Sequence, residues 1–283
     1  MKKKHAQVSF SKTSKTLNNE IFFHRIHMAC SKHVRIPATW LYPHEKVLRD
    51  PPKRDSATPK ELITWLCHEV KLGDEHVVND TFHHLKPYLF VSLMYPRVPS
   101  DLWCLKLYEL NVYFLVAAYI LDDYHMEKYP RTLVKKMVEA FDSVNKDMEE
   151  CFPDCPDGPE VVKSLSYVTN ASSRNIIATM IDYINRSSLI VWNSGRVPLN
   201  KAKDFRKRMA GTLRAYLHAV QMKDSEWSTW SIAQDLWSRC PESGAPCFYL
   251  SNEFFSGFLE RHPLFQCRRF MIITCMVLPY ARL

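Results

Sequence analysis

Glycine is scarce in this chain, and several patterns that mark common protein classes are missing. Only 6 of the 283 residues are glycine, and strand-like segments are few, which together favour helices. The nine cysteines include no CxxC pair and have no histidine partners at zinc-finger spacing, so we expect reduced, mostly structural thiols in a cytosolic setting. With 46% hydrophobic residues, the chain can bury one large core or at most two modest ones.

The N-terminal segment has no apolar stretch long enough for the core of a signal peptide. Residues 1–19 are polar and rich in Lys, Ser and Thr, which predicts neither a secretory signal nor a membrane span. We expect a flexible basic tail over residues 1–35, then one domain over 36–283, in a cytoplasmic protein. A transit peptide is a weaker alternative because arginine is scarce before Arg25.

The net charge of +8 does not indicate a nucleic-acid binder once the charges are located. Residues 1–36 hold eight Lys and Arg residues against one Glu, a net of +7, so the remaining body is nearly neutral. A protein that binds the phosphate backbone needs a basic face on its folded domain. We therefore expect no nucleic-acid partner.

Helical periodicity dominates the body, which has no internal repeat and no long linker. Short turn clusters containing Pro and Gly separate the expected helices. Pro99, Ser100 and Asp101 read as a stop followed by a helix cap. The expected helices span residues 61–70, 80–93, 101–121, 132–151, 160–192, 200–237, 249–260 and 263–276.

An acidic cluster, LDDYHMEKY (121–129), follows a ten-residue apolar run at 112–121. Asp123 and Glu127 are four residues apart and would share one face of a helix. Carboxylate oxygens are the ligands that Mg²⁺ prefers, usually together with substrate phosphates. The alternative is that Asp122 and Asp123 simply end a helix. Acidic side chains at a helix C-terminus oppose its dipole, however, and a bound cation would relieve that arrangement.

Asp-Asp-x-x-x-Glu after an apolar, aromatic helix resembles the first metal motif of the class I terpene synthases. Residues 94–96 and 105–121 resemble that family's approach to the motif. The segment WLYPHEKVL (40–48) is similar to the Asn-Pro-His segment of many microbial members, with Tyr42 in place of the Asn. The similarity covers residues 36–283 and is to microbial and coral-type members with a single α-domain.

The resemblance implies an all-α class I terpenoid-synthase helical bundle and a lyase activity in isoprenoid biosynthesis. The implied enzyme is a terpene cyclase that ionises an isoprenyl diphosphate, farnesyl or geranylgeranyl, and cyclises the carbocation as diphosphate departs. It implies three Mg²⁺ ions per active site, with Mn²⁺ as a substitute. Asp122, Asp123 and Glu127 would hold ions on one side of the site, and departing diphosphate can act as the base.

The family's second metal motif has the form Asn/Asp-x-x-x-Ser/Thr-x-x-x-Glu, and Asn252, Ser256 and Glu260 fit it. Positions i, i+4 and i+8 share one helical stripe, so their oxygens can meet a further cation. A competing alignment reads residues 249–257 as the broken helix that precedes this motif, with Glu253 replacing the diphosphate-sensing Arg. Under that alignment the chain is C-terminally short and stops where the true motif should begin.

Cationic and aromatic side chains are the implied substrate contacts. Arg206 resembles the family's diphosphate sensor and would be catalytic together with Asp122 and Asp123; Arg208 and Arg214 are alternatives. Aromatic faces stabilise a carbocation in a dry cavity, although aromatic residues equally serve as ordinary core. The candidate wall residues lie on the expected helices nearest the acidic motif and are Tyr88, Phe90, Tyr113, Phe114 and Tyr119.

Two other interpretations remain open at this stage. A truncated or degenerate, non-catalytic helical member of the family would explain the absence of the Arg-Tyr pair that closes over the diphosphate in that family. A prenyl-chain-elongating synthase shares the fold but needs a second aspartate-rich motif, which the sequence does not contain. Substrate length, product skeleton and oligomeric state do not follow from residue spacing.

Overall fold

The computed structural model divides into two units, Pro52–Arg282 and a unit made of Met1–Pro51 with Leu283. Within the N-terminal unit, strands β1 (Phe23–His27) and β2 (His33–Pro37) form an antiparallel hairpin. The predicted basic tail at 1–35 therefore contains β1 and part of β2. The residues that the structure describes are 23–27, 33–37, 57–95, 98–122, 131–222, 245–257 and 259.

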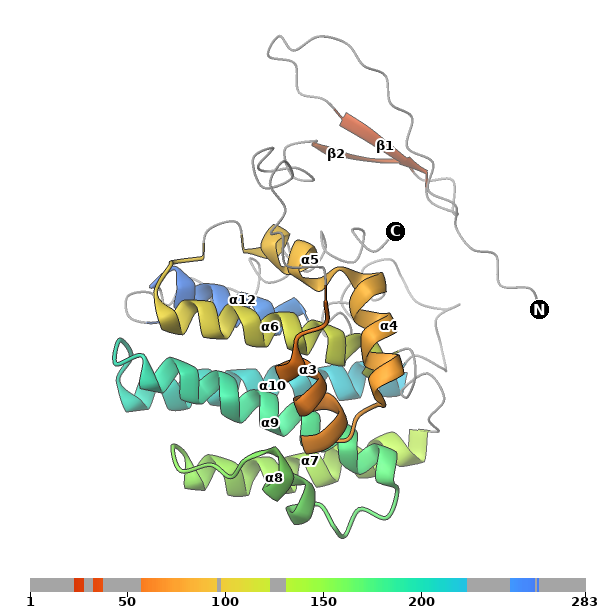
Figure 1. Cartoon of the computed structure of the whole chain (residues 1–283), viewed down its shortest axis with the longest axis vertical. Coiled ribbons are helices and arrows are strands. Elements are labelled where there is room, and N and C mark those ends of the chain that lie inside the picture. The colour runs from red at the N-terminus through yellow and green to blue at the C-terminus, as the bar shows by residue number, and fades with distance from the viewer. Residues whose placement is uncertain are drawn as a thin grey trace, which may run out of the picture. The chain divides into compact units, whose positions relative to one another are not determined.

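Every regular element described in the larger unit is a helix, which confirms the prediction of an all-α body (Figure 1). No described helix combines the length and the apolar character needed to cross a membrane. The elements are α3 (Lys60–Ile63), the π-helical η1 (Thr64–Glu69), α4 (Glu75–Leu85), α5 (Pro87–Met94), α6 (Leu102–Ile120), α7 (Arg131–Cys151), α8 (Gly158–Ser164), α9 (Ala171–Asn193), α10 (Leu199–Met222) and α12 (Ala245–Phe255).

Two predicted helices are each divided in the structure. The segment 80–93 is broken at Lys86, because a residue that precedes proline is disfavoured in the helical region and Pro87 starts α5. The segment 160–192 is broken between α8 and α9, where the Asn170 side chain accepts a hydrogen bond from the Ser173 amide and caps α9.

The break at Lys86 allows a test of the backbone. Lys86 has φ 47° and ψ 60°, a left-handed conformation that costs an L-residue roughly 1–2 kcal/mol. We expect Lys86→Gly to raise the free energy of unfolding in urea by about 0.5–1 kcal/mol, since glycine adopts this conformation freely but loses more entropy on folding. Lys207→Gly, at an exposed position inside α10, should instead lower it by about 1 kcal/mol. Equal losses in both variants would contradict the left-handed turn.

Helix α6 runs antiparallel to α9 along most of its length. Tyr183, in the middle of α9, donates a hydrogen bond of 2.7 Å to Asn111 in the middle of α6. Arg196, just after α9, pairs at 3.3 Å with Asp101, which caps the start of α6. The N-terminus of α9 consequently lies at the same end of the bundle as the C-terminus of α6.

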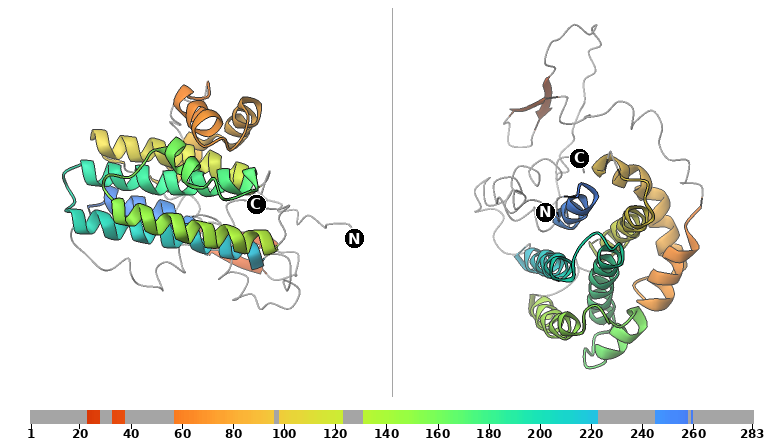
Figure 2. Two further views of the ribbon diagram at one scale, coloured as in Figure 1. Left: turned by 90° about the horizontal axis from the view of Figure 1, so that it is seen from below. Right: turned by 90° about the vertical axis from the view of Figure 1, so that its left-hand side faces the viewer.

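Helix α12 also runs antiparallel to α6. Ser251 contacts Asn111 at 3.3 Å, and Phe254 lies under the Arg196 guanidinium at 5.1 Å, close to the start of α6. Viewed end-on in the right-hand panel of Figure 2, α6, α9, α10 and α12 surround a common centre, with α7 and α8 outside α9 and α10. The buried aromatic and aliphatic side chains of these helices form one continuous core.

Candidate functional site

The predicted acidic motif begins where the buried helix α6 ends. The helix is mostly apolar, and its segment Leu110–Ala117 is buried. Leu121 is its C-cap, and Asp122 follows with a half-buried side chain. Asp123 and Glu127 lie outside the described residues. Because the apolar run packs in the core and ends at Leu121, the carboxylate of Asp122 lies at the edge of the bundle.

The same end of the bundle carries the positive end of another helix. Asn175, in the first turns of α9, donates a hydrogen bond of 2.6 Å to the carbonyl of Lys71. Two residues later, Gly73 packs beside Ile120, the last residue of α6. Helix N-termini carry partial positive charge and favour anions. This end therefore combines a carboxylate with a field that suits a bound anion.

The predicted second motif does not extend over one helix. Ser256 donates its hydroxyl to the Asn252 carbonyl at 2.6 Å, within its own backbone turn. Gly257 has a left-handed φ of +68° and follows the end of α12 at Phe255, so the predicted helix 249–260 is shorter than expected. Glu260 lies outside the described residues. The shared stripe assumed for positions i, i+4 and i+8 is thus interrupted between Ser256 and Glu260.

The antiparallel packing also separates the two motifs. Asp122 lies eleven residues beyond Asn111, about 16 Å along α6, and Ser256 lies five residues beyond Ser251 in the opposite direction, about 7 Å. Asn252 therefore lies level with the middle of α6, Ser256 lies toward its N-terminal end, and Asp122 lies at its C-terminal end. Asp122 cannot share one Mg²⁺ with Asn252 or Ser256 at this separation, since side-chain ligands meet Mg²⁺ at about 2 Å. That the two motifs hold separate ions around one diphosphate stays a prediction.

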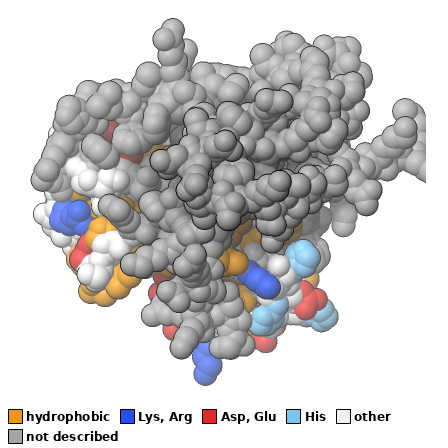
Figure 3. Space-filling model, turned by 90° about the horizontal axis from the view of Figure 1, so that it is seen from above, with side chains coloured by type: hydrophobic (Ala, Val, Ile, Leu, Met, Phe, Trp, Pro, Cys, Tyr) orange, Lys and Arg blue, Asp and Glu red, His pale blue; other side chains and the backbone are white. Residues whose placement is uncertain are grey.

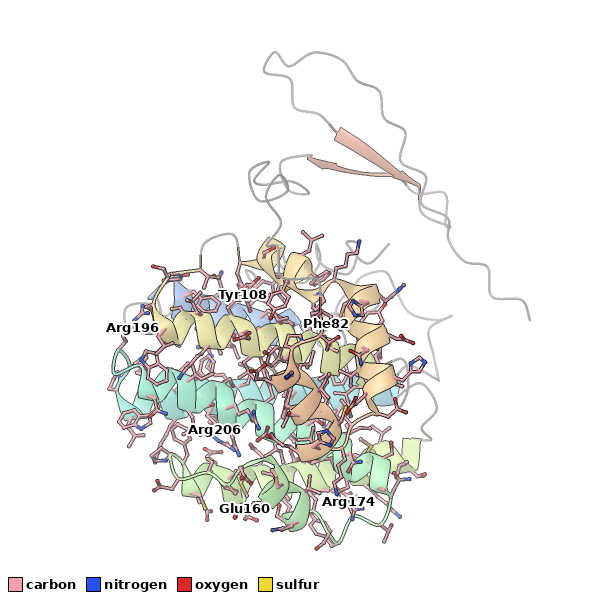
Figure 4. The ribbon with its side chains drawn as sticks, viewed as in Figure 1. Phe82, Tyr108, Glu160, Arg174, Arg196 and Arg206 are labelled. Carbon is pink, nitrogen blue, oxygen red and sulfur yellow. The ribbon has the colours of Figure 1, made fainter. Side chains whose placement is uncertain are left out.

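Arg206 is fully buried and lies inside the bundle, between α9 and α7 (Figure 4). Its guanidinium donates to the side-chain carbonyls of Asn145 at 3.0 Å and Asn185 at 3.2 Å. Burial lowers the pKa of Arg206, an effect that Cys155 and then Glu149 oppose. Asn185 lies two residues after Tyr183, which contacts the middle of α6. The Arg206 guanidinium is therefore near the middle of the bundle and far from the C-terminal end of α6, where Asp122 lies. The structure does not bring these two predicted catalytic residues together.

The alternative sensor arginines are also engaged. Arg208 makes a bidentate ion pair with the buried Glu253 of α12, at 2.6 and 2.5 Å. Arg214 pairs with Asp142 of α7 at 2.7 Å in a more exposed position. Glu253, the residue at the sensor position of the competing alignment, thus holds α12 against α10.

The five candidate aromatic residues divide between two sides of α6. Phe114 faces α9 and stacks on Tyr183 with ring centroids 3.8 Å apart. Tyr88 donates to Glu109 at 3.3 Å, and burial followed by Glu109 raises the pKa of Tyr113, so both lie on the α5 side. Phe90 is half-buried against the core and Tyr119 is half-buried near the end of α6.

Sequence reasoning missed a buried polar group in the middle of this core. Asn111 accepts hydrogen bonds from Tyr183 and Ser251, and its side-chain nitrogen has no partner among the described residues. Phe248 of α12 lies 6.5 Å from the Phe114 ring and completes the surroundings. The one signal available was an asparagine directly before the apolar run at 112–121.

The described residues contain no group of three or more His, Cys, Asp or Glu side chains that could hold a metal ion. Histidine and acidic side chains do gather at one edge of the surface in Figure 3, and exposed His76 pairs with Asp80 at 2.9 Å, but such pairs stop at two ligands. Of the six predicted metal ligands, Asp122, Asn252 and Ser256 are within the described part of the chain. No protein-family model matches the chain, and neither does any curated protein.

Proposed function

We propose that this protein is a Mg²⁺-dependent terpene synthase of the class I type, which ionises an isoprenyl diphosphate and cyclises the resulting carbocation. The diphosphate would be held at the end of α6. Asp122, with Asp123 and Glu127, would bind the ions that neutralise the diphosphate. Carboxylate oxygens are the type of ligand that Mg²⁺ prefers. The observation that carries the proposal is that buried α6 delivers Asp122 to the edge of the bundle at the first residue of the acidic motif.

The electrostatics at that end support an anion held through cations. The C-terminus of α6 is the negative end of its helix dipole, so an acidic cluster there is unfavourable unless a cation binds. The N-terminus of α9 lies at the same end and favours the negative charge of a diphosphate. Bound Mg²⁺ supplies charge stabilisation as the carbon–oxygen bond breaks.

The interior next to α6 supports the second half of the proposal. Phe114, Tyr183 and Phe248 come from α6, α9 and α12, and all three are buried. Aromatic faces attract a cation without attacking it, and a site closed to water protects the carbocation from premature quenching. Of the predicted wall residues, Phe114 is the one that belongs to this group.

A second candidate is a non-catalytic helical protein that binds diphosphates without turning them over. It is favoured by the state of the predicted sensor arginines, because Arg206, Arg208 and Arg214 all donate to partners within the bundle. A synthase needs fixed positive charge on the leaving diphosphate in addition to the metal. In a synthase that charge would have to come from another residue, and Arg174, in the first turn of α9 at the Asp122 end, has an Nε without a partner among the described residues.

The deciding experiment is incubation of the purified chain with geranyl, farnesyl and geranylgeranyl diphosphate, with Mg²⁺ or with a chelator, followed by gas chromatography. We expect terpene products from one of the longer two substrates and only with Mg²⁺. Calorimetric titration of inorganic diphosphate with Mg²⁺ separates the two candidates. Binding without any product would favour the non-catalytic protein, and neither binding nor product from folded protein would exclude both.

A further inference from the structure

Asn111 is a buried amide with an unused hydrogen-bond donor in the middle of the helical core. It is 0% exposed, as are its two partners, Tyr183 and Ser251. Both partner hydroxyls donate to the Oδ1 of Asn111, at 2.7 and 3.3 Å. Its Nδ2 has no partner among the described residues. Buried N–H groups are almost always hydrogen-bonded to the protein or to an ordered water, so this amide needs an acceptor.

A water molecule is the acceptor that fits the chemistry around this amide. Phe114 and Phe248, which lie against Tyr183 and against each other, offer no acceptor atom in their side chains. The hydroxyl oxygens of Tyr183 and Ser251 can accept a hydrogen bond as well as donate one. A water that accepts from Nδ2 can therefore donate to these two oxygens, which lie beside the same carboxamide group. Three hydrogen bonds are typical of a buried water.

The depth of Asn111 determines which part of a bound isoprenyl chain would reach it. Asp122 lies eleven residues after Asn111, about 16 Å along α6, and Phe114 lies between the two, about 12 Å from Asp122. With the diphosphate held at Asp122, the hydrocarbon would extend past Phe114, and its distant end would lie near Asn111. Ring closure joins the ionised carbon to a distant double bond and moves the positive charge to that part of the chain. The charge would thus reach the Asn111 end after cyclisation and not before it.

We propose, on the basis of the synthase function proposed above, that Asn111 positions the water molecule that ends the reaction, so that the product is a cyclic terpene alcohol. The water oxygen, held by Nδ2, forms a bond to the cationic carbon with its free lone pair. The oxonium so formed gives its extra proton to the departed diphosphate as the products leave. No oxidant or reductant takes part. Asn111 acts through the water and is therefore a positioning residue.

One held water is compatible with a site that excludes solvent. Asn111, Tyr183 and Ser251 come from α6, α9 and α12, and none of them is exposed, so bulk water does not reach the cation from this side. The alternative role for such a water is to join the three helices. Removing a water of that kind would change stability but not the identity of the product. The product therefore separates the two roles.

The first measurement concerns the water itself and needs no substrate. NMR spectroscopy of the isotope-labelled full chain should show a long-lived water in contact with the side-chain amide protons of Asn111. Asn111→Leu, which lacks these protons, assigns the signal. A folded chain without this contact would overturn the proposal and leave the proposed synthase function untouched.

The second measurement follows the oxygen atom of the product. The parent chain is incubated with farnesyl or geranylgeranyl diphosphate and Mg²⁺ in H₂¹⁸O, and we expect a cyclic alcohol that carries ¹⁸O. Asn111→Leu should lower the alcohol share of the products several-fold in favour of hydrocarbons. The same result is expected when Tyr183→Phe and Ser251→Ala are added, since removing donors and acceptor together leaves neither hydroxyl without the amide oxygen it binds.

Thr179→Val is the matched control for these variants. Thr179 is also 0% exposed on α9, but its hydroxyl donates at 2.7 Å to the Asn175 carbonyl of its own helix. The control should keep the alcohol share of the parent. A parent product without ¹⁸O-labelled alcohol, or an alcohol share unchanged by Asn111→Leu with or without the two added changes, would overturn the proposal but not the synthase function. No terpene product from the parent would overturn the synthase function and the role of the water together, whereas the NMR result would still show whether Asn111 holds one.

Discussion

Replacing Asp122 and Asp123 together by alanine is expected to abolish Mg²⁺-dependent turnover of isoprenyl diphosphates while the helical circular-dichroism signal stays intact. The two carboxylates would hold the ions that neutralise the leaving diphosphate. Losing about 4 kcal/mol of charge stabilisation corresponds to roughly a thousandfold loss of rate. Folding should be unaffected, because negative charge at the C-terminal end of α6 opposes the helix dipole and its removal costs little.

A matched control for this double variant replaces two exposed aspartates on other helices. Asp147 on α7 and Asp204 on α10 are both exposed and belong to no ion pair among the described residues. Asp147→Ala with Asp204→Ala should therefore keep the same Mg²⁺ dependence and rate as the parent chain. Turnover retained in the Asp122 and Asp123 double variant would sink the metal assignment, whatever the control shows.

Local signals explain why the position of α6 could be predicted. Asp101 caps the helix by accepting hydrogen bonds from the amides of Trp103 and Cys104, both at 3.1 Å, as its place after Pro99 and Ser100 indicated. The apolar run at 112–121 then fills the second half of the helix up to its C-cap, Leu121. The helix cap and the apolar run are both signals carried by neighbouring residues in the sequence. The sequence alone could therefore predict that the acidic motif begins at the end of a helix.

The distance between the two predicted metal motifs depends on how the helices pack, and the sequence alone could not predict it. Asn252 and Ser256 satisfy the spacing of a metal motif, but spacing does not tell in which direction α12 crosses α6. The contact between Ser251 and Asn111 fixes that direction, and it joins residues 140 apart in the sequence. A motif of three residues spaced four apart does not predict a contact between residues so distant in the sequence.

The sequence alone also could not predict which charged residues are buried. Arg206 stands in a basic segment, FRKRMAGTLR, which reads as a solvated helix face or a diphosphate sensor. In the structure it points between α7 and α9 and reaches two asparagines. Neighbours in sequence did not predict this, because Lys207 next to it is exposed and Arg208 pairs with Glu253. Which face of α10 enters the core is decided by the helices packed on it.

The strongest effect on stability is expected at Asp182, a residue that is 1% exposed on α9. One oxygen of its carboxylate accepts a hydrogen bond from the Trp65 indole and pairs with Arg186, each at 2.6 Å. Arg186 also binds Glu69, so η1 and α9 are joined through this group. Asp182→Ala leaves a buried indole donor and part of a guanidinium without an acceptor. We expect a loss of about 3–5 kcal/mol in the free energy of unfolding.

Asp142→Ala is the control for this change, since it removes the same side chain from an ion pair that is 48% and 40% exposed. Exposed pairs contribute about 0–1 kcal/mol, so urea denaturation should show a small loss there. Equal losses in the Asp182 and Asp142 variants would contradict the role given to the buried carboxylate. Asp182→Asn should lie between the two alanine variants, because its amide oxygen can still accept from the Trp65 indole.

The pH dependence of stability gives a separate test of the same carboxylate. Burial raises the pKa of Asp182 above its ordinary value, although Arg186 and then the Trp65 indole act to lower it. Between the ordinary and the raised pKa, the folded chain keeps a proton that the unfolded chain has lost. Stability contributed by this proton is present at lower pH and is lost as the pH rises through the folded-state pKa. Asp182→Asn cannot titrate, so the difference in unfolding free energy between parent and variant should change with pH across that window. A constant difference would show that the carboxyl titrates alike in the folded and unfolded chain.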